Sequence, residues 1–393
     1  MRISCLPKLY TSRDLSGVSV IPDTIDKVVA MAKVEPTYCH FIVPKDQGHW
    51  TWHKDLFDPK HFQEVPVLYS KETIIGHTPP NIEVHEYFRK EWCFDFLLNQ
   101  MYESAGPLSM YSTEAQNLYS IGARRLIVTY FTETWIDERL ALLSTPAGKR
   151  QVASSLTTGP CLAMTQQDIT ALYELSKLLS PSERAKIQER MHLVKPCIDH
   201  GLVDSRMDRY LSERAARKAT GVTNVFHGGS LEAKRNLPKM ADVVEMVSVI
   251  RKVKFIVKTQ KESEAPFDQS CVVYERKVNR QTYLDSLGQG DILWCGSDYE
   301  GTGLAYMEAI RSGMGALFID KPWIRERIPS DYPFIVKKTE DAGEVLLWMI
   351  DHPEEVASWG QKLRDFIGDK WSSDTIGPEL LRIVRPYVDA LHE

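Results

Sequence analysis

The sequence has no strong excess of one charge and no apolar run long enough to cross a bilayer. Its formal net charge is −5 over 393 residues. That balance argues against a protein that binds nucleic acid or anionic lipid through its overall charge. Binding through a local basic patch is still open. Lys8 and Arg13 interrupt any apolar stretch near the start, so we expect no signal peptide and a cytoplasmic protein.

The chain also lacks Cys-x-x-Cys pairs, low-complexity segments and short-period repeats. Its seven cysteines are spread out, mostly within apolar runs, which predicts free buried thiols in a reducing compartment. His49 and His53 stand four residues apart, but no further cysteine or carboxylate completes a set at a familiar metal-ligand spacing. We therefore expect no metal site.

What the chain does have is the composition of a packed globular protein, with 43% hydrophobic and 26% charged residues. Its length exceeds what one ordinary core holds, so we expect two domains. Short apolar β-rich runs alternate with amphipathic helical patterns, which indicates α/β domains with mainly parallel sheets. A first series of expected strands lies at 2–6, 40–43, 65–69, 93–98, 125–130, 161–165 and 192–195. A second series lies at 224–227, 254–258, 271–274, 291–294, 316–319 and 334–337.

A charged, arginine-rich segment separates the two series. We expect an N-terminal Rossmann-like domain over 1–205, a linker over 206–221 and a second such domain over 222–372. Ligands of open parallel sheets bind beyond the carboxyl ends of the strands, near helix N-termini. Two such edges facing each other across a cleft would make a deep site.

Residues 291–320 carry the strongest functional signal. An apolar strand leads to Ser297, a turn containing Gly301 and Gly303 follows, and a helix begins near Leu304. Glycines let the backbone approach an anion closely, and free N–H groups at a helix start point toward it. The pattern is typical of a phosphate cradle.

Two glutamates flank this turn. Glu300 precedes the glycines, and Glu308 lies about one turn inside the helix. Because a carboxylate can accept two hydroxyl hydrogen bonds, the pair suits a ligand with hydroxyls on both sides of a diphosphate, such as a nucleotide sugar. A Gly-x-Gly turn alone is common, so the prediction depends on these features occurring together.

The segment Ser-x-x-Glu-Gly-x-Gly-Leu-x-x-x-Glu-Ala resembles the signature of retaining glycosyltransferases of the GT-B fold, the group-one family with a Glu-x7-Glu motif. The resemblance covers residues 222 to about 367. It implies two doubly wound Rossmann-like domains facing across a cleft, with a C-terminal helix at 373–393 packing back on the N-terminal domain. It also implies metal-independent, front-face transfer of a hexosyl or pentosyl group to an acceptor hydroxyl with retention of configuration. The co-substrate would be a nucleotide sugar, with a UDP-sugar favoured and GDP- or ADP-sugars open, and no other cofactor is implied.

The resemblance also implies roles for individual residues. Glu300 would contact the transferred sugar and act in catalysis, and Glu308 would bind the ribose. The other donor-binding candidates are Ser297, Gly301, Thr302, Gly303, Leu304, Lys258, Val278 and Gly17.

The cation expected beside the leaving diphosphate is less directly matched. Ser230 stands where the family has an arginine, and Arg235, with Lys234 beside it, best matches the family's lysine. We expect both basic residues to act in catalysis, because the leaving diphosphate accumulates charge and arginine can bind it through two parallel hydrogen bonds.

The N-terminal half resembles the family only in architecture, so the acceptor is not predicted. His77, His85 and Glu133 are the candidates for contact with it. A glycan or small metabolite, a lipid-linked sugar and a modified nucleic-acid base all remain open. The expected helix at 25–33 is not strongly basic, which weighs against a lipid.

Two other functions remain open beside transfer. The first is a nucleotide-sugar epimerase-like enzyme on the same fold, which would need acid and base residues on both sides of the sugar ring. The second is a non-catalytic sugar-nucleotide binding protein, which would keep Glu308 and lack activity.

Overall fold

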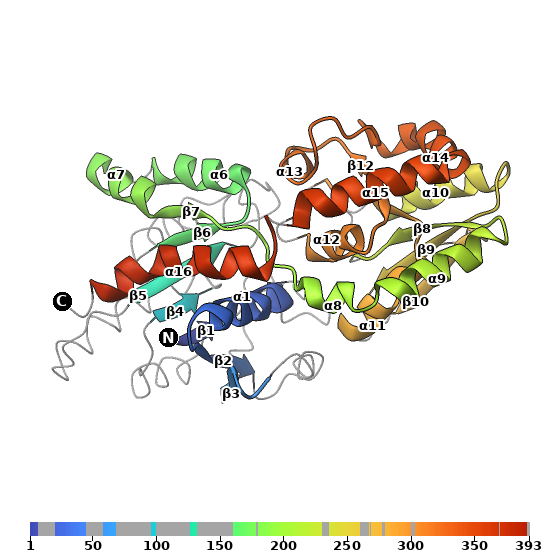
Figure 1. Cartoon of the computed structure of the whole chain (residues 1–393). Helices are drawn as coiled ribbons and strands as arrows, with labels where there is room; N and C mark the ends of the chain where they lie inside the picture. Colours follow the sequence, from blue (N-terminus) through green and yellow to red (C-terminus); the bar gives the residue numbers. More distant parts are fainter. Residues whose placement is uncertain are drawn as a thin grey trace. The chain divides into compact units, whose positions relative to one another are not determined.

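A computed structural model describes residues 1–6, 20–44, 58–67, 96–99, 126–131, 160–177, 180–229, 236–259, 267, 269–276, 280–298, 300, 303–368 and 370–390. The chain divides into two compact units (Figure 1). The first consists of Met1–Cys197 with Ser373–Glu393, and the second is Ile198–Ser372. Each is an α/β unit, as the alternating sequence pattern predicts.

The first unit is built on a sheet whose described strands all pair in parallel. Their spatial order is β3-β2-β1-β4-β5-β6-β7, so the direction of winding reverses between β1 and β4. The strands are β1 (Arg2–Leu6), β2 (Tyr38–Pro44), β3 (Phe62–Val67), β4 (Phe96–Asn99), β5 (Leu126–Phe131), β6 (Cys161–Ala163) and β7 (Met191–Leu193). The helices described in this unit are α1 (Val20–Val34), α6 (Gln166–Ser176), α7 (Pro181–Arg190) and α16 (Ser373–Asp389).

The C-terminal helix α16 lies against α1 (Figure 1). It is amphipathic, and Ile376, Leu380 and Val384 are buried in the core of this unit. Gly377 brings the two helices so close that a Cβ there would collide with the backbone of Ala30. The last described helix of the chain therefore completes the unit that the first residues begin.

The second unit has a parallel sheet in the order β10-β9-β8-β11-β12-β13. Its strands are β8 (Thr223–His227), β9 (Val253–Thr259), β10 (Val272–Arg276), β11 (Ile292–Cys295), β12 (Gly315–Ile319) and β13 (Ile335–Val336). Its helices are α8 (His200–Asp204), α9 (Met207–Lys218), α10 (Leu237–Ser248), α11 (Arg280–Asp285), α12 (Leu304–Arg311), α13 (Pro322–Arg325), α14 (Ala342–Asp351) and α15 (Pro353–Gly368).

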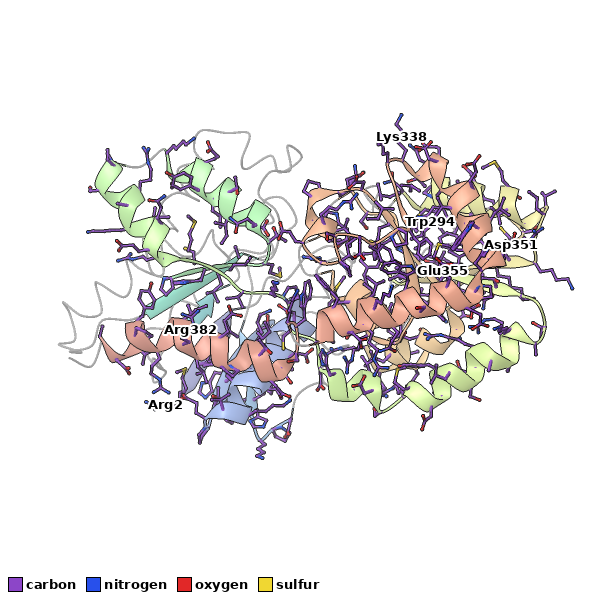
Figure 2. The ribbon with its side chains drawn as sticks, turned by 45° about the horizontal axis from the view of Figure 1, so that its top comes forward. Arg2, Trp294, Lys338, Asp351, Glu355 and Arg382 are labelled. Carbon is purple, nitrogen blue, oxygen red and sulfur yellow. The ribbon has the colours of Figure 1, made fainter. Side chains whose placement is uncertain are left out.

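The core of the second unit surrounds β11 and β12, every residue of which is buried. Such uninterrupted apolar strands are typical of parallel sheets covered on both faces. Figure 2 shows Trp294 of β11 inside this crowded interior. Within the described ranges, no helix is long and apolar enough to span a membrane.

Residues 206–221, expected as a linker, instead form α9 and its C-terminal end, and they belong to the second unit. Tyr210 is fully buried and donates a hydrogen bond to the Leu284 carbonyl at 2.6 Å. Arg214 donates to the carbonyl and the hydroxyl of Ser312, at 2.6 and 2.8 Å. The arginine-rich composition that made this segment resemble a linker therefore includes a residue, Arg214, that binds it to the rest of the second unit.

Candidate functional site

The candidate site lies at the carboxyl edge of the second sheet, where the winding direction changes. From β8, the chain builds outward through β9 and β10 on one side, and then through β11, β12 and β13 on the other. β8 and β11 are parallel neighbours, with Val225 opposite Ile292. The loops that follow these two strands therefore begin side by side, at the place where open α/β sheets bind ligands.

A side-chain hydrogen bond ties the two loops together. Asn236 is the residue that precedes α10, and its side-chain amide donates to the Gly296 carbonyl at 2.8 Å. Its backbone is left-handed, with φ 56°, a conformation that asparagine adopts more readily than most residues. This bond fixes the start of α10 relative to the end of β11.

Beneath the loops lies a buried polar and aromatic layer. The hydroxyls of Ser297 and Tyr306 are 2.9 Å apart, and the Tyr306 ring meets the His227 ring edge-on at 5.7 Å between centroids. A Cβ at Gly229 would lie 2.6 Å from His227 Nε2, so this glycine lets the backbone approach the imidazole. The sequence identified Ser297 as a candidate but missed Tyr306 and His227, which only the fold brings to it.

Gly303 packs against a buried guanidinium. Gly303 has φ 55° and immediately precedes α12. A Cβ there would lie 2.6 Å from Nη1 of Arg327 and 3.7 Å from the Cβ of Glu300. Arg327 is 1% exposed, and its guanidinium lies 5.0 Å from the ring centroid of Trp323 and 5.4 Å from that of Trp371. The backbone angle therefore favours glycine at 303, and a Cβ there would displace the Arg327 guanidinium.

Glu308 lies on α12, one turn beyond Gly303, and is buried. Its Oε1 accepts hydrogen bonds from Nε and Nη2 of Arg280, at 2.9 and 2.7 Å. Arg280 is the first residue of α11, and Tyr283 of the same helix donates to the Ala305 carbonyl at 2.5 Å. Burial, with a smaller contribution from the charge of Glu308, raises the pKa of the Tyr283 hydroxyl well above its ordinary value. That hydroxyl therefore stays protonated and keeps donating.

Lys258 lies near the carboxyl end of β9, opposite Glu275 of β10 in the strand register. Its ammonium group contacts the Glu275 carboxylate. The side chain is 6% exposed, and burial lowers its pKa to about 8. The lysine is thus still mostly protonated at neutral pH, but it is held less firmly in the charged form than a surface lysine.

The structure places five of the predicted site residues around the glycine turn or on its helix: Ser297, Glu300, Gly303, Leu304 and Glu308. Lys258 lies on a neighbouring strand of the same sheet. The other predicted residues lie outside the described part of the chain: Arg235, Lys234, Gly301, Thr302, Val278, Gly17, His77, His85 and Glu133.

Replacing Gly303 with alanine tests the packing of the turn. We expect the free energy of unfolding to fall by about 1–3 kcal/mol, because alanine is strained at positive φ and its Cβ displaces the confined Arg327. Chemical denaturation measures this loss. Gly343→Ala, near the start of α14, is the matched control, since the atom nearest to its Cβ is 4.0 Å away. Equal losses in the two variants would contradict the packing argument.

Comparison with known proteins finds likeness in structure. No family model matches the sequence, and no curated protein matches it either. Among solved structures, HepE of Anabaena in complex with UDP and glucose matches with a TM-score of 0.72 at 12% identity, covering 98% of this chain and 99% of that one. HepE has also been solved with UDP-glucose.

Two further matches extend over both domains. Sucrose-phosphate synthase from Thermosynechococcus elongatus matches with a TM-score of 0.65 at 10% identity and covers 99% of each chain. WaaG, a glycosyltransferase involved in lipopolysaccharide biosynthesis, matches with a TM-score of 0.62 at 14% identity, over 100% of this chain and 99% of its own. With two parallel sheets of Rossmann-like order and these matches over nearly the whole chain, the protein has the GT-B fold.

Proposed function

We propose that this protein is a retaining glycosyltransferase that moves a hexosyl or pentosyl group from a UDP-sugar to an acceptor hydroxyl without a metal ion. The observation that carries the proposal is the placement of the Glu300–Gly303–Glu308 segment at the switch point of the second sheet. Ligands of this fold class bind at that edge. The UDP and UDP-glucose bound to HepE, a protein of similar fold, support the choice of nucleotide.

In this proposal the two glutamates bind different parts of the donor. Glu308 binds the ribose hydroxyls, and Glu300, at the other end of the glycine turn, binds hydroxyls of the transferred sugar. Gly303 permits close approach of the diphosphate to the start of α12, where backbone N–H groups and the helix dipole favour an anion. Ser297, held by Tyr306, supports this turn from beneath.

Further residues belong to the proposed donor site, and of those named here only Lys258 lies in the described part of the chain. Arg235 and Lys234 would stabilise the leaving diphosphate, helped by the amides around Gly301 and Thr302. Val278 would face the nucleobase and Gly17 the phosphates, while Lys258 would add a second phosphate or sugar contact. His77 and Glu133 are the proposed acceptor-side residues, and the acceptor would be a glycan, a small metabolite or a nucleic-acid base.

A front-face route accounts for the chemistry with these groups. The acceptor hydroxyl attacks the anomeric carbon from the side on which the diphosphate leaves, and its proton passes to the departing phosphate oxygen. In this proposal Glu300 binds hydroxyls of the transferred sugar. It therefore does not act as a nucleophile on the face of the anomeric carbon opposite the leaving diphosphate. Charge grows on the diphosphate in the transition state, which is where cations and backbone amides contribute most.

The function itself is tested with a panel of nucleotide sugars. UDP-sugars should raise the melting temperature more than GDP- or ADP-sugars do, because a ligand that binds only the folded state stabilises it. Mass analysis should then show a product heavier than the acceptor by one sugar residue. Binding without any transfer or hydrolysis would favour a sugar-nucleotide binding protein instead, and a changed sugar without an acceptor would favour an epimerase.

Glu308→Gln tests the ribose contact. We expect the dissociation constant of UDP to rise about ten- to hundredfold, since hydrogen bonds to a charged acceptor contribute about 1.5–3 kcal/mol. Calorimetry measures the change, and Glu344→Gln, an exposed glutamate on α14, is the control. An unchanged dissociation constant for Glu308→Gln would contradict the assignment.

Retention predicts the stereochemistry of the product. A donor with an α-linked sugar should give an α-linked product first, because attack and departure occur on the same face. Proton NMR, recorded early enough to precede mutarotation or side reactions, distinguishes the two anomers. A β-linked first product would exclude the front-face route and weaken the proposed family relationship.

A further inference from the structure

The pairing of Arg280 with Glu308 has an unusual hydrogen-bond pattern. Nε and Nη2 of the guanidinium both donate to the same carboxylate oxygen, Oε1, at 2.9 and 2.7 Å. The Arg280 side chain is 6% exposed and that of Glu308 is 3% exposed. A guanidinium often binds one carboxylate oxygen with each nitrogen, whereas here both nitrogens donate to the same oxygen of Glu308.

The two oxygens of Glu308 therefore differ. Oε1 has two lone pairs, and Arg280 occupies both. Oε2 accepts no hydrogen bond from any group in the part of the chain that the structure describes, and it is not among the fully buried polar atoms that lack a partner. A ligand hydroxyl that binds Glu308 must then meet Oε2.

The helices that carry the pair are themselves fixed relative to each other. Tyr283 of α11 donates to the backbone of α12 at Ala305. The other end of α11 is held by Asp285, which accepts a hydrogen bond from Nε of Arg206 at 2.8 Å. Because α11 and α12 are fixed relative to each other, the planar guanidinium of Arg280 can hold the carboxylate of Glu308 in one orientation.

We infer that Arg280 is a positioning residue, which holds Oε2 of Glu308 toward the nucleotide and so makes the site select ribose over deoxyribose. The inference rests on the proposed function. A carboxylate that could rotate would replace a missing ribose hydroxyl with water or another hydroxyl. A fixed carboxylate cannot turn toward such a substitute partner. The deoxy analogue therefore leaves a desolvated oxygen of Glu308 without a hydrogen bond. Buried polar groups reject ligands that lack a hydroxyl in this way.

Stability alone is a weak reason for such a pair. Removing two charges from water costs free energy that their attraction only partly returns, so buried ion pairs contribute little net stability. A rigid two-nitrogen fork provides orientation, which the single ammonium of lysine cannot reproduce. This difference separates positioning from simple charge neutralisation and supplies the test.

The test compares the binding of UDP and 2′-deoxy-UDP to the full chain by calorimetry. The variants are Arg280→Lys, which keeps the charge, and Arg280→Gln, which keeps a donor without the charge. Arg217→Lys is the matched control, because Arg217 also binds one carboxylate through two nitrogens, that of Asp291 before β11. Melting temperatures identify any variant that is not folded.

We expect the wild-type protein to bind UDP about ten- to hundredfold more tightly than 2′-deoxy-UDP. Arg217→Lys should keep that ratio. In Arg280→Lys and Arg280→Gln the ratio should fall to about threefold or less, because the carboxylate is no longer held in one orientation. A purely structural role would not make the Arg280 variants lose the preference for UDP over 2′-deoxy-UDP while Arg217→Lys keeps it.

Two other outcomes have distinct meanings. If folded Arg280 variants keep the wild-type ratio while Glu308→Gln loses it, the positioning role of Arg280 is wrong and the proposed function stands. If Glu308→Gln keeps the ratio as well, or the wild-type protein shows no preference, then Glu308 does not bind the ribose and both proposals fail on this point.

Discussion

The position at which helix α12 begins determines the whole candidate site. The left-handed backbone of Gly303, packed against Arg327, sets that position. From there, one helical turn places Glu308, and the preceding turn places Glu300. Because Arg327 is 1% exposed and its guanidinium packs against the rings of Trp323 and Trp371, its movement is restricted. A buried cation that does no chemistry in the proposed mechanism therefore packs against the residue that separates Glu300 from the helix carrying Glu308.

The other end of the same helix is held just as firmly. Arg311 binds the carboxylate of Asp204 through two nitrogens, and Arg364 contacts the same carboxylate at 2.9 Å. Arg214 donates to the carbonyl of Ser312, which follows the helix, and burial lowers the pKa of Arg214 to about 10. Cations are favourable at a helix C-terminus, where carbonyl groups lack partners. The helix that presents the site is thus fixed at both ends by side chains from other elements.

Much of this architecture could be predicted from the sequence because it depends on local patterns. Each expected strand coincides at least in part with a strand of the structure, since apolar β-rich runs such as 291–294 are confined to the sheet interior. The glycine turn and its two glutamates were likewise visible as a contiguous motif. Arg280, Tyr306 and Arg327 were not predicted as site residues. Their roles come from contacts with distant residues, and nothing in their immediate neighbours distinguishes a buried arginine from a solvated one. The same ambiguity made α9 look like a linker.

The place of α16 has a consequence for how the molecule is made. The first unit is not contiguous in the chain, since its sheet begins at Arg2 while α16, which covers α1, begins at Ser373. During synthesis the second unit, Ile198–Ser372, is complete before that helix leaves the ribosome. Until then, the face of α1 that includes Ala30 lacks its cover. The unit whose translation begins first is therefore also the unit whose last helix is translated after the whole of the other.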